Sequence, residues 1–163
     1  RLAISKGNLP DMVRLTDLDE DTGAFLRGWD APEVPGSPWV TPPPAAERRV
    51  ALISSAGLRL PEDQLFSADA TDYRVIPAER ADHVVMDHVS TSHDRTGFQQ
   101  DVNTIFPLAR LKEMAAAGEI GSVADFHYSF MGASDPRQME PQARSLAAIM
   151  KAEGVNTVVL CPV

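Results

Sequence analysis

The chain has 163 residues, of which 44% are hydrophobic, 23% charged and 6% aromatic, and this balance is that of an ordinary soluble domain. Its net charge of −8 disfavours nucleic acid and anionic membranes as partners, and no apolar run approaches the roughly 20 residues that span a bilayer. We expect a cytoplasmic protein, because the sequence opens with no secretory segment and its one cysteine, Cys161, excludes an internal disulfide.

Residues 1–48 differ in composition from the rest of the chain. Six of the 13 prolines lie at positions 32–44, and we predict an extended polyproline connector there, because proline fixes φ and lacks an amide donor. Before it, the apolar residues of 9–27 predict one amphipathic helix, or two short helices interrupted at Gly23. We therefore expect an amino-terminal helical segment with a Pro-rich connector over 1–48, and an α/β domain over 49–163.

The domain alternates apolar runs with amphipathic segments. Pro107 suits the first turn of a helix, and Gly118 supplies a left-handed stop. The alternation predicts a three-layer α/β sandwich with a mostly parallel sheet. The expected strands are 50–55, 73–77, 82–90, 123–132 and 155–163, with 50–54, 83–87 and 155–160 central. The expected helices are 107–118, with Leu108, Leu111 and Met114 or Ala115 on its apolar face, and 138–154, with Leu146, Ile149 and Met150.

Three of the four histidines, His83, His88 and His93, fall within eleven positions. Histidine and aspartate are good ligands for zinc or iron, so a metal-dependent lyase or hydrolase is one alternative. However, an alternating strand directs His83 and His88 to opposite faces, and the sequence has no HExxH pair. We therefore predict no bound metal.

The segment from Ser92 to Gly97 follows a predicted strand and precedes a predicted helix. Ligands of open α/β sheets bind beyond the carboxyl ends of the strands, where such loops lie. His93 could act as a general acid or base, Asp94 could orient it, and Arg95 could hold a carboxylate in a bidentate fork. The alternative is an ordinary loop with local caps.

Four other residues are weaker candidates. Asp101 and Asn103 precede a predicted helix, where they could bind substrate or simply cap the helix. His127 could face substrate, but its apolar neighbours favour a structural histidine. Cys161 closes the last strand, where a thiol nucleophile would be placed, although a lone cysteine is most often a small buried hydrophobe.

Several motifs of the domain resemble one family of proteins. They are VALISSAGLRL, YRVIP, EGVNTVVLCPV, and the ordered pattern HDR-x5-D-x-N-x2-FPL-x-RL, followed by G-x-IG and H-x3-FMG. From about Arg49 to Val163, the sequence resembles the selenoprotein B family of glycine, sarcosine, betaine and D-proline reductases. A pattern of this length and order is not a chance match.

The resemblance implies a subunit of a reductase complex that reductively cleaves a C–N bond α to a carboxylate. A pyruvoyl group on a partner subunit is expected to capture the amine of a small amine-bearing carboxylate. A selenocysteine or cysteine, as a soft nucleophile, is expected to attack the α-carbon. On this hypothesis the catalytic candidates are His93, Asp94 and Cys161, and the substrate-binding candidates are Arg95, Asp101, Asn103 and His127.

The sequence departs from the family at the nucleophile. The family places its chalcogen after a Pro-Val turn, whereas Cys161 lies two positions before Val163 and does not match that place. We expect selenocysteine or cysteine just beyond Val163, no reductase activity from these 163 residues alone, and a sheet edge that pairs with another copy or a second chain. A non-catalytic partner subunit is the alternative.

Overall fold

The computed structural model describes residues 14–28, 36, 40–90 and 95–163. The chain divides into two units, 1–36 and 37–163. In the first unit, a 3-10 turn at Leu15–Asp17 is followed by helix α1, Glu20–Arg27, whose first turn is capped by the carboxylate of Asp19. The predicted interruption at Gly23 is wrong, since Gly23 lies inside α1 and the break between the two helical segments falls at Leu18 and Asp19. No helix among the described residues is long and apolar enough to cross a membrane.

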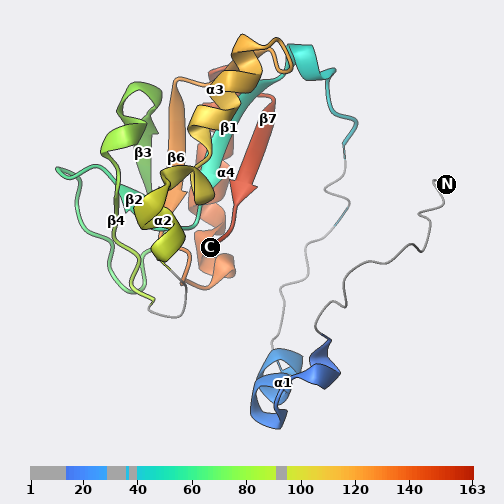
Figure 1. Ribbon diagram of the computed structural model, residues 1–163, viewed down its shortest axis with the longest axis vertical. Helices are drawn as coiled ribbons and strands as arrows, with labels where there is room; N and C mark the ends of the chain where they lie inside the picture. The colour runs from blue at the N-terminus through green and yellow to red at the C-terminus, as the bar shows by residue number, and fades with distance from the viewer. Residues whose placement is uncertain (1–13, 29–35, 37–39, 91–94) are drawn as a thin grey trace. The chain divides into compact units, whose positions relative to one another are not determined.

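The described part of the second unit is built on a five-stranded sheet in the order β3-β6-β1-β5, with β7 on the other side of β1 (Figure 1). β1 is parallel to β5, β6 and β7, and only β3 runs antiparallel, against β6. The strands span Arg49–Ser54 (β1), Tyr73–Pro77 (β3), Ser122–Val123 (β5), Phe126–Phe130 (β6) and Thr157–Cys161 (β7). The sheet is therefore mostly parallel, as the sequence predicts.

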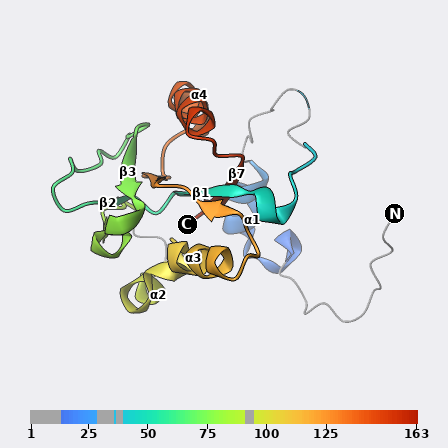
Figure 2. The same cartoon turned by 90° about the horizontal axis from the view of Figure 1, so that it is seen from above.

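Helices cover both faces of the sheet. Figure 2 shows α4, Pro136–Ala152, on one side, and α2, Thr96–Gln100, with α3, Leu108–Ala116, on the other. The carboxylate of Asp135 caps α4, and Gly118 follows α3 at φ +74°. The three-layer α/β sandwich is thus confirmed.

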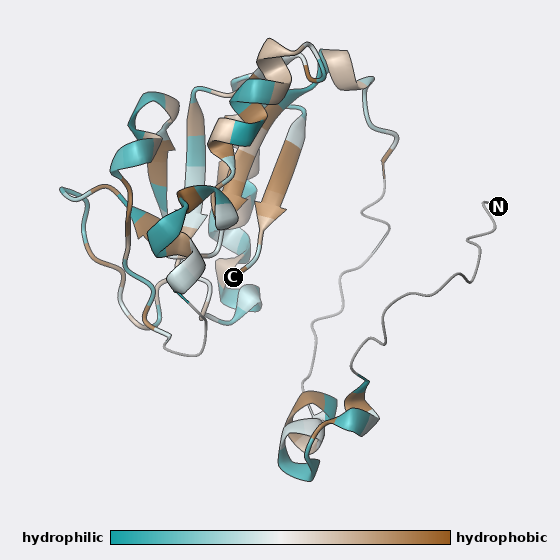
Figure 3. Cartoon of the chain, viewed as in Figure 1, coloured by the Kyte–Doolittle hydropathy of each residue, from teal (hydrophilic) through white to brown (hydrophobic). Residues whose placement is uncertain are grey.

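Two hydrophobic cores lie between the layers, and Figure 3 shows that hydrophobic residues make up much of the strands between them. Buried apolar residues alternate along β1, so that Val50 and Leu52 face α3 while Ala51 faces α4. The α3 core consists of Val50, Leu52, Ala56, Leu58, Ile76, Phe106, Leu108, Leu111 and Ile120. The α4 core consists of Ala51, Ala124, Tyr128, Phe130, Leu146, Met150 and Val155.

The prediction of 155–160 as a central strand is wrong, because among the described residues β7 pairs with β1 alone. The prediction of a central strand at 83–87 is also wrong. Only β4, Val85–Met86, is a strand there, and it pairs antiparallel with β2, Leu58–Arg59, in a separate two-stranded sheet. The residues before it form a 3-10 turn at Ala78–His83. The physical reason is competition for β1, because β5 and β6 already occupy one of its sides and β7 occupies the other.

Candidate functional site at the carboxyl edge of the sheet

Three neighbouring strands place small polar residues side by side at the carboxyl edge of the sheet. Ser54 of β1 is the register partner of Ser129 in β6 and of Cys161 in β7. Register partners point to the same face, and Cys161 packs against the α3 core, so the row lies on the α3 face. Ser54 and Ser129 are fully buried. This edge is where α/β sheets bind ligands.

The two serine hydroxyls bind backbone amides of the segment that follows β1. Ser54 Oγ accepts a hydrogen bond from the amide of Ala56 at 3.2 Å. Ser129 Oγ accepts one from the amide of Leu58 at 2.8 Å and donates to the carbonyl of Phe130 at 3.3 Å. Neither serine is among the site residues predicted from the sequence. The signal for Ser54 was the small polar pair that closes the buried run VALI before Ala-Gly.

Cys161 lies where the sequence places it, at the end of β7 and at this edge (Figure 1). It is half-buried, and burial raises the pKa of its thiol above the usual value. The thiol therefore stays protonated near neutral pH, which disfavours Cys161 as a nucleophile. It lines a cavity of about 230 Å³ together with Ile53, Ser54, Ser55, Phe130, Met139, Leu160 and Pro162.

The hydroxyl of Ser55 binds the segment after β7. Ser55 Oγ accepts a hydrogen bond from the amide of Val163 at 2.9 Å, and the amide of Ser55 donates to the carbonyl of Cys161 at 3.1 Å. These two bonds keep residues 161–163 at the carboxyl edge.

Arg95 is attached to the loop after β4. Its Nη2 donates to the carbonyl of His88 at 2.8 Å and to the carbonyl of Ser90 at 2.7 Å. Its Nε and Nη1 have no partner among the described residues. His93 and Asp94 lie outside the described residues, so their geometry relative to Arg95 is not part of this site.

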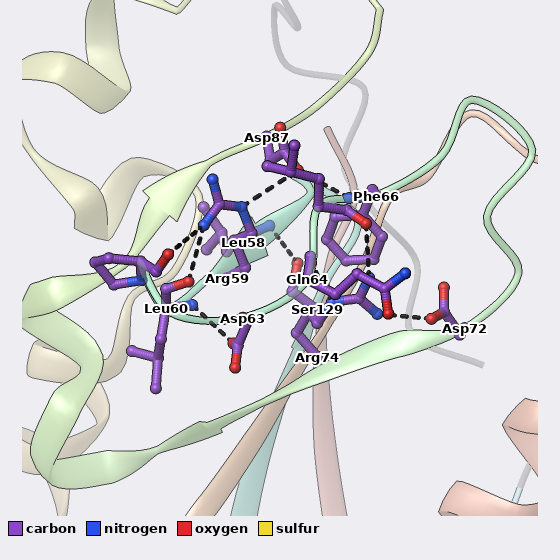
Figure 4. A network of polar contacts seen from close by, with 12 residues as sticks. Leu58, Arg59, Leu60, Asp63, Gln64, Phe66, Asp72, Arg74, Asp87 and Ser129 are labelled. Carbon is purple, nitrogen blue, oxygen red and sulfur yellow. Dashed lines mark hydrogen bonds and ion pairs between the residues drawn. The ribbon is translucent and has the colours of Figure 1, made fainter.

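A network of polar contacts fixes the neighbouring loop, 60–72 (Figure 4). Asp87 Oδ2 accepts from the amide of Phe66 at 2.8 Å and from Arg59 Nε at 3.3 Å. Arg74 lies over the ring of Phe66, 4.2 Å from its centroid, and donates to the carbonyls of Gln64 and Leu65. The loop is thus tied both to β4 and to β3.

Asp101 and Asn103 form a local cap before α3. Asp101 Oδ1 accepts from the backbone amide and the side-chain amide of Asn103, and these bonds lower the pKa of Asp101. Asn103 Oδ1 in turn accepts from the amide of Ala109 at 3.2 Å. Asn103 also lines a cavity of about 290 Å³ beside α3, which Lys112 borders as well. The contacts of both residues match the capping alternative.

His127 is fully buried between the sheet and α3. Its Nδ1 accepts from the amide of Leu52 at 3.0 Å, and its ring meets that of Phe106 edge-on. Burial is the largest cause that lowers the pKa of His127 to about 4, so the imidazole is neutral at pH 7. These contacts match the structural alternative for His127.

Two of the three histidines considered as metal ligands, His83 and His88, have different surroundings in the structure. His83 is exposed and pairs with the adjacent Asp82, whereas His88 is buried and accepts from the amide of Ser90. In the part of the chain that the structure describes, no three His, Cys, Asp or Glu side chains are grouped to bind a metal. His93, the third candidate ligand, lies outside that part.

Comparison with known proteins gives a family and two relatives. The profile of glycine/sarcosine/betaine reductase selenoprotein B matches residues 33–163. D-proline reductase subunit gamma of Acetoanaerobium sticklandii is 28% identical over 133 residues, which cover 74% of this chain and 54% of the relative. Glycine reductase complex component B subunit gamma of Carboxydothermus hydrogenoformans is 28% identical over 132 residues, which cover 74% of this chain and 30% of the relative.

The chain therefore spans about half of the first relative's length and about a third of the second's. No solved structure gives a significant match to it. The profile match extends over most of the chain and includes every strand and helix of the second unit. On this evidence, the chain belongs to the glycine/sarcosine/betaine reductase selenoprotein B family.

Proposed function

We propose that this chain forms the substrate-binding part of a reductase-complex subunit that reductively cleaves the C–N bond of a small amino acid or betaine. Family membership supports the class of reaction, and the names of the two relatives support a complex with other reductase subunits. We place that complex in the cytoplasm as part of the proposal. The observation that carries the proposal is the carboxyl edge, where Ser54, Ser129 and Cys161 lie at the ends of parallel strands. The segment that binds Arg95 contacts Gly57, just after β1, at the same edge.

Arg95 supplies the anchor for the substrate carboxylate. The two carbonyls that it binds fix one nitrogen of the guanidinium, and in the part of the chain that the structure describes Nε and Nη1 bind no other group, which leaves them for an anion. The cavity lined by Cys161 is bordered mainly by apolar side chains and has no cationic side chain among the described residues of its lining, so the proposal takes the carboxylate anchor from Arg95, outside that lining. His93 and Asp94 remain proposed acid–base residues of the same loop.

The chain's own thiol is a poor match for the nucleophile, because burial raises the pKa of Cys161. The bond from Val163 to Ser55 holds the segment after β7 at the edge, so a selenocysteine or cysteine that followed Val163 would lie beside the proposed pocket. Together with a pyruvoyl group on a partner subunit, such a residue would supply the attack on the α-carbon and the activation of the nitrogen. We accordingly expect this chain alone to lack reductase activity.

The side of β7 that faces away from β1 supports the proposal that a second copy or another chain pairs with this strand. Among the described residues β7 pairs only with β1, and Val158 and Leu160 are 37% and 69% exposed. An open strand with exposed apolar side chains favours pairing with a further strand.

Titration of the protein with glycine, sarcosine, betaine and D-proline, followed by NMR or calorimetry, tests the proposed function. We expect at least one of the four to bind, and Arg95→Ala to weaken that binding about tenfold or more, because a charged hydrogen bond is lost. Arg110→Ala, on the exposed side of α3, is the matched control and should bind as the wild type does. Binding of none of the four, or equal binding by Arg95→Ala, would overturn the proposal.

A further inference from the structure

Gly57 lies where the chain after β1 meets the chain after β4. Its φ is +62°, and its amide donates to the carbonyl of Phe130 at the end of β6. Its carbonyl accepts from the amide of Asp87 at 2.8 Å. A Cβ added to Gly57 would lie 2.9 Å from both the N and the Cα of His88. Only glycine allows both this backbone conformation and this close approach.

Asp87 also stabilises this junction, because its amide binds the carbonyl of Gly57 and its side chain binds β2 and the segment that follows it. Its carboxylate, near the top of Figure 4, accepts from the amide of Phe66 and from Arg59 Nε. Arg59 is fixed in turn by its Nη1, which donates to the carbonyls of Leu60 and Pro61 at 3.0 Å each. The side chains of the Arg59–Asp87 pair are 15% and 26% exposed, so water screens this contact less than a surface pair.

Residues 87–90 connect this junction to Arg95. The backbone of Asp87 is bonded to Gly57, and the next residue, His88, offers its carbonyl to Arg95 Nη2. The imidazole of His88 accepts from the amide of Ser90, whose carbonyl is the second acceptor for Arg95. A displacement of 87–90 therefore moves both carbonyls that orient the guanidinium.

We propose that Gly57 and Asp87 are positioning residues that set the place of the Arg95 guanidinium through His88 and Ser90. The inference rests on the proposed function of Arg95 as the carboxylate anchor. Neither residue touches the substrate. Their effect is geometric, since a guanidinium that binds a carboxylate in a fork tolerates little displacement.

Gly57→Ala tests the first residue, and the chain offers a matched control. Gly118 also has a positive φ, +74°, but a Cβ there meets nothing within 4 Å. Gly118→Ala therefore carries a similar backbone strain without pressing on a neighbour. We expect Gly57→Ala to weaken binding of the carboxylate by about tenfold or more and to shift the Arg95 Nε NMR signal. Gly118→Ala should leave both unchanged.

Asp87→Asn tests the second residue without backbone strain. It keeps the proposal testable if Gly57→Ala does not fold. Asp72→Asn is its control, because Asp72 pairs with Arg74 in the same network but has no contact with 87–90. We expect weaker binding and a shifted Arg95 signal in Asp87→Asn alone.

The outcomes separate the two proposals. If Arg95→Ala weakens binding but Gly57→Ala and Asp87→Asn bind as their controls do, the positioning role is wrong and the proposed function stands. If the wild-type protein binds none of the four carboxylates, or Arg95→Ala binds equally, the proposed function fails and the positioning inference fails with it.

Discussion

The imidazole of His127 takes the place of a backbone acceptor inside the sheet. β1 pairs with β5 through Val50 and with β6 from Ile53 onward, and between these points the amide of Leu52 donates to His127 Nδ1. The neighbouring strand is interrupted there by Ala124 and Asp125. Because a buried amide without a partner is costly, the side chain keeps the central strand satisfied across the interruption.

The burial of His127 makes the free energy of unfolding depend on pH. The pKa of His127 falls from 6.5 to about 4 on folding, mainly through burial, with Lys112 and Arg49 adding to the shift and Asp125 opposing it. The unfolded chain then binds the proton more tightly, so stability is complete above pH 6.5 and decreases as the pH falls toward 4. We expect the free energy of unfolding, measured with urea, to drop by about 2 kcal/mol between pH 7 and pH 5.

The control for this prediction is the exposed His83, whose side chain is 62% exposed. His83→Gln should keep the full loss between pH 7 and pH 5, whereas His127→Gln should remove most of it. A His127→Gln protein with an unchanged pH dependence would show that another group is responsible.

At the scale of elements, α3 packs on the sheet through the predicted residues, with Ala115 as the third, whereas α4 uses fewer residues than its sequence pattern predicts. Leu111 and Leu146 are 8% and 1% exposed, and they lie in the two cores. Met114 and Ile149, which were predicted as alternatives or members of the apolar faces, are 37% and 45% exposed. The stripe of α4 is therefore narrower than predicted and centres on Leu146 and Met150.

Aspartate substitutions distinguish the buried positions from the exposed ones. Leu146→Asp places an unpaired carboxylate against the sheet, and we expect it to cost more than about 3 kcal/mol and to unfold or aggregate the protein. Leu111→Asp should behave in the same way in the α3 core. Ile149→Asp should change the free energy of unfolding by only about 0.5 kcal/mol. Thermal melting checks all three, and a wild-type melt for Leu146→Asp would refute the assigned face.

At the scale of the whole molecule, one side of β7 pairs with no strand among the described residues, and this predicts self-association. The strand TVVLC carries no charged residue, although edge strands in soluble proteins usually carry charge or proline that blocks pairing. The exposed Leu160 is the fourth residue of this uncharged strand. The strand is therefore suited to pair with another strand.

We expect the protein to self-associate through β7, in a manner that depends on concentration. Leu160→Lys should shift the equilibrium to the monomer in analytical ultracentrifugation, because it places a charge on the exposed side of the strand. Leu65→Lys, at an exposed position in loop 60–72, is the control and should leave association unchanged. A wild-type protein that stays monomeric at high concentration would contradict the prediction.

The sequence by itself determined the features that depend on neighbouring residues. Helical spacing around Leu111 and Leu146 located α3 and α4, and apolar runs located β1 and β7. The long pattern from His93 to Gly132 was enough to identify the family, which the comparisons confirm. These features are local, since periodicity and turn chemistry lie within one segment.

Only the tertiary structure decided which distant segments meet. The amide of Leu52 and the imidazole of His127 are 75 residues apart in the chain, and the amide of Leu58 and the hydroxyl of Ser129 are 71 apart. Such contacts follow from strand register, and a register shift of one residue would move each side chain to the opposite face. The row at the carboxyl edge, the burial of His127 and the contact of Gly57 with the 87–90 segment all depend on that register, which no single segment encodes.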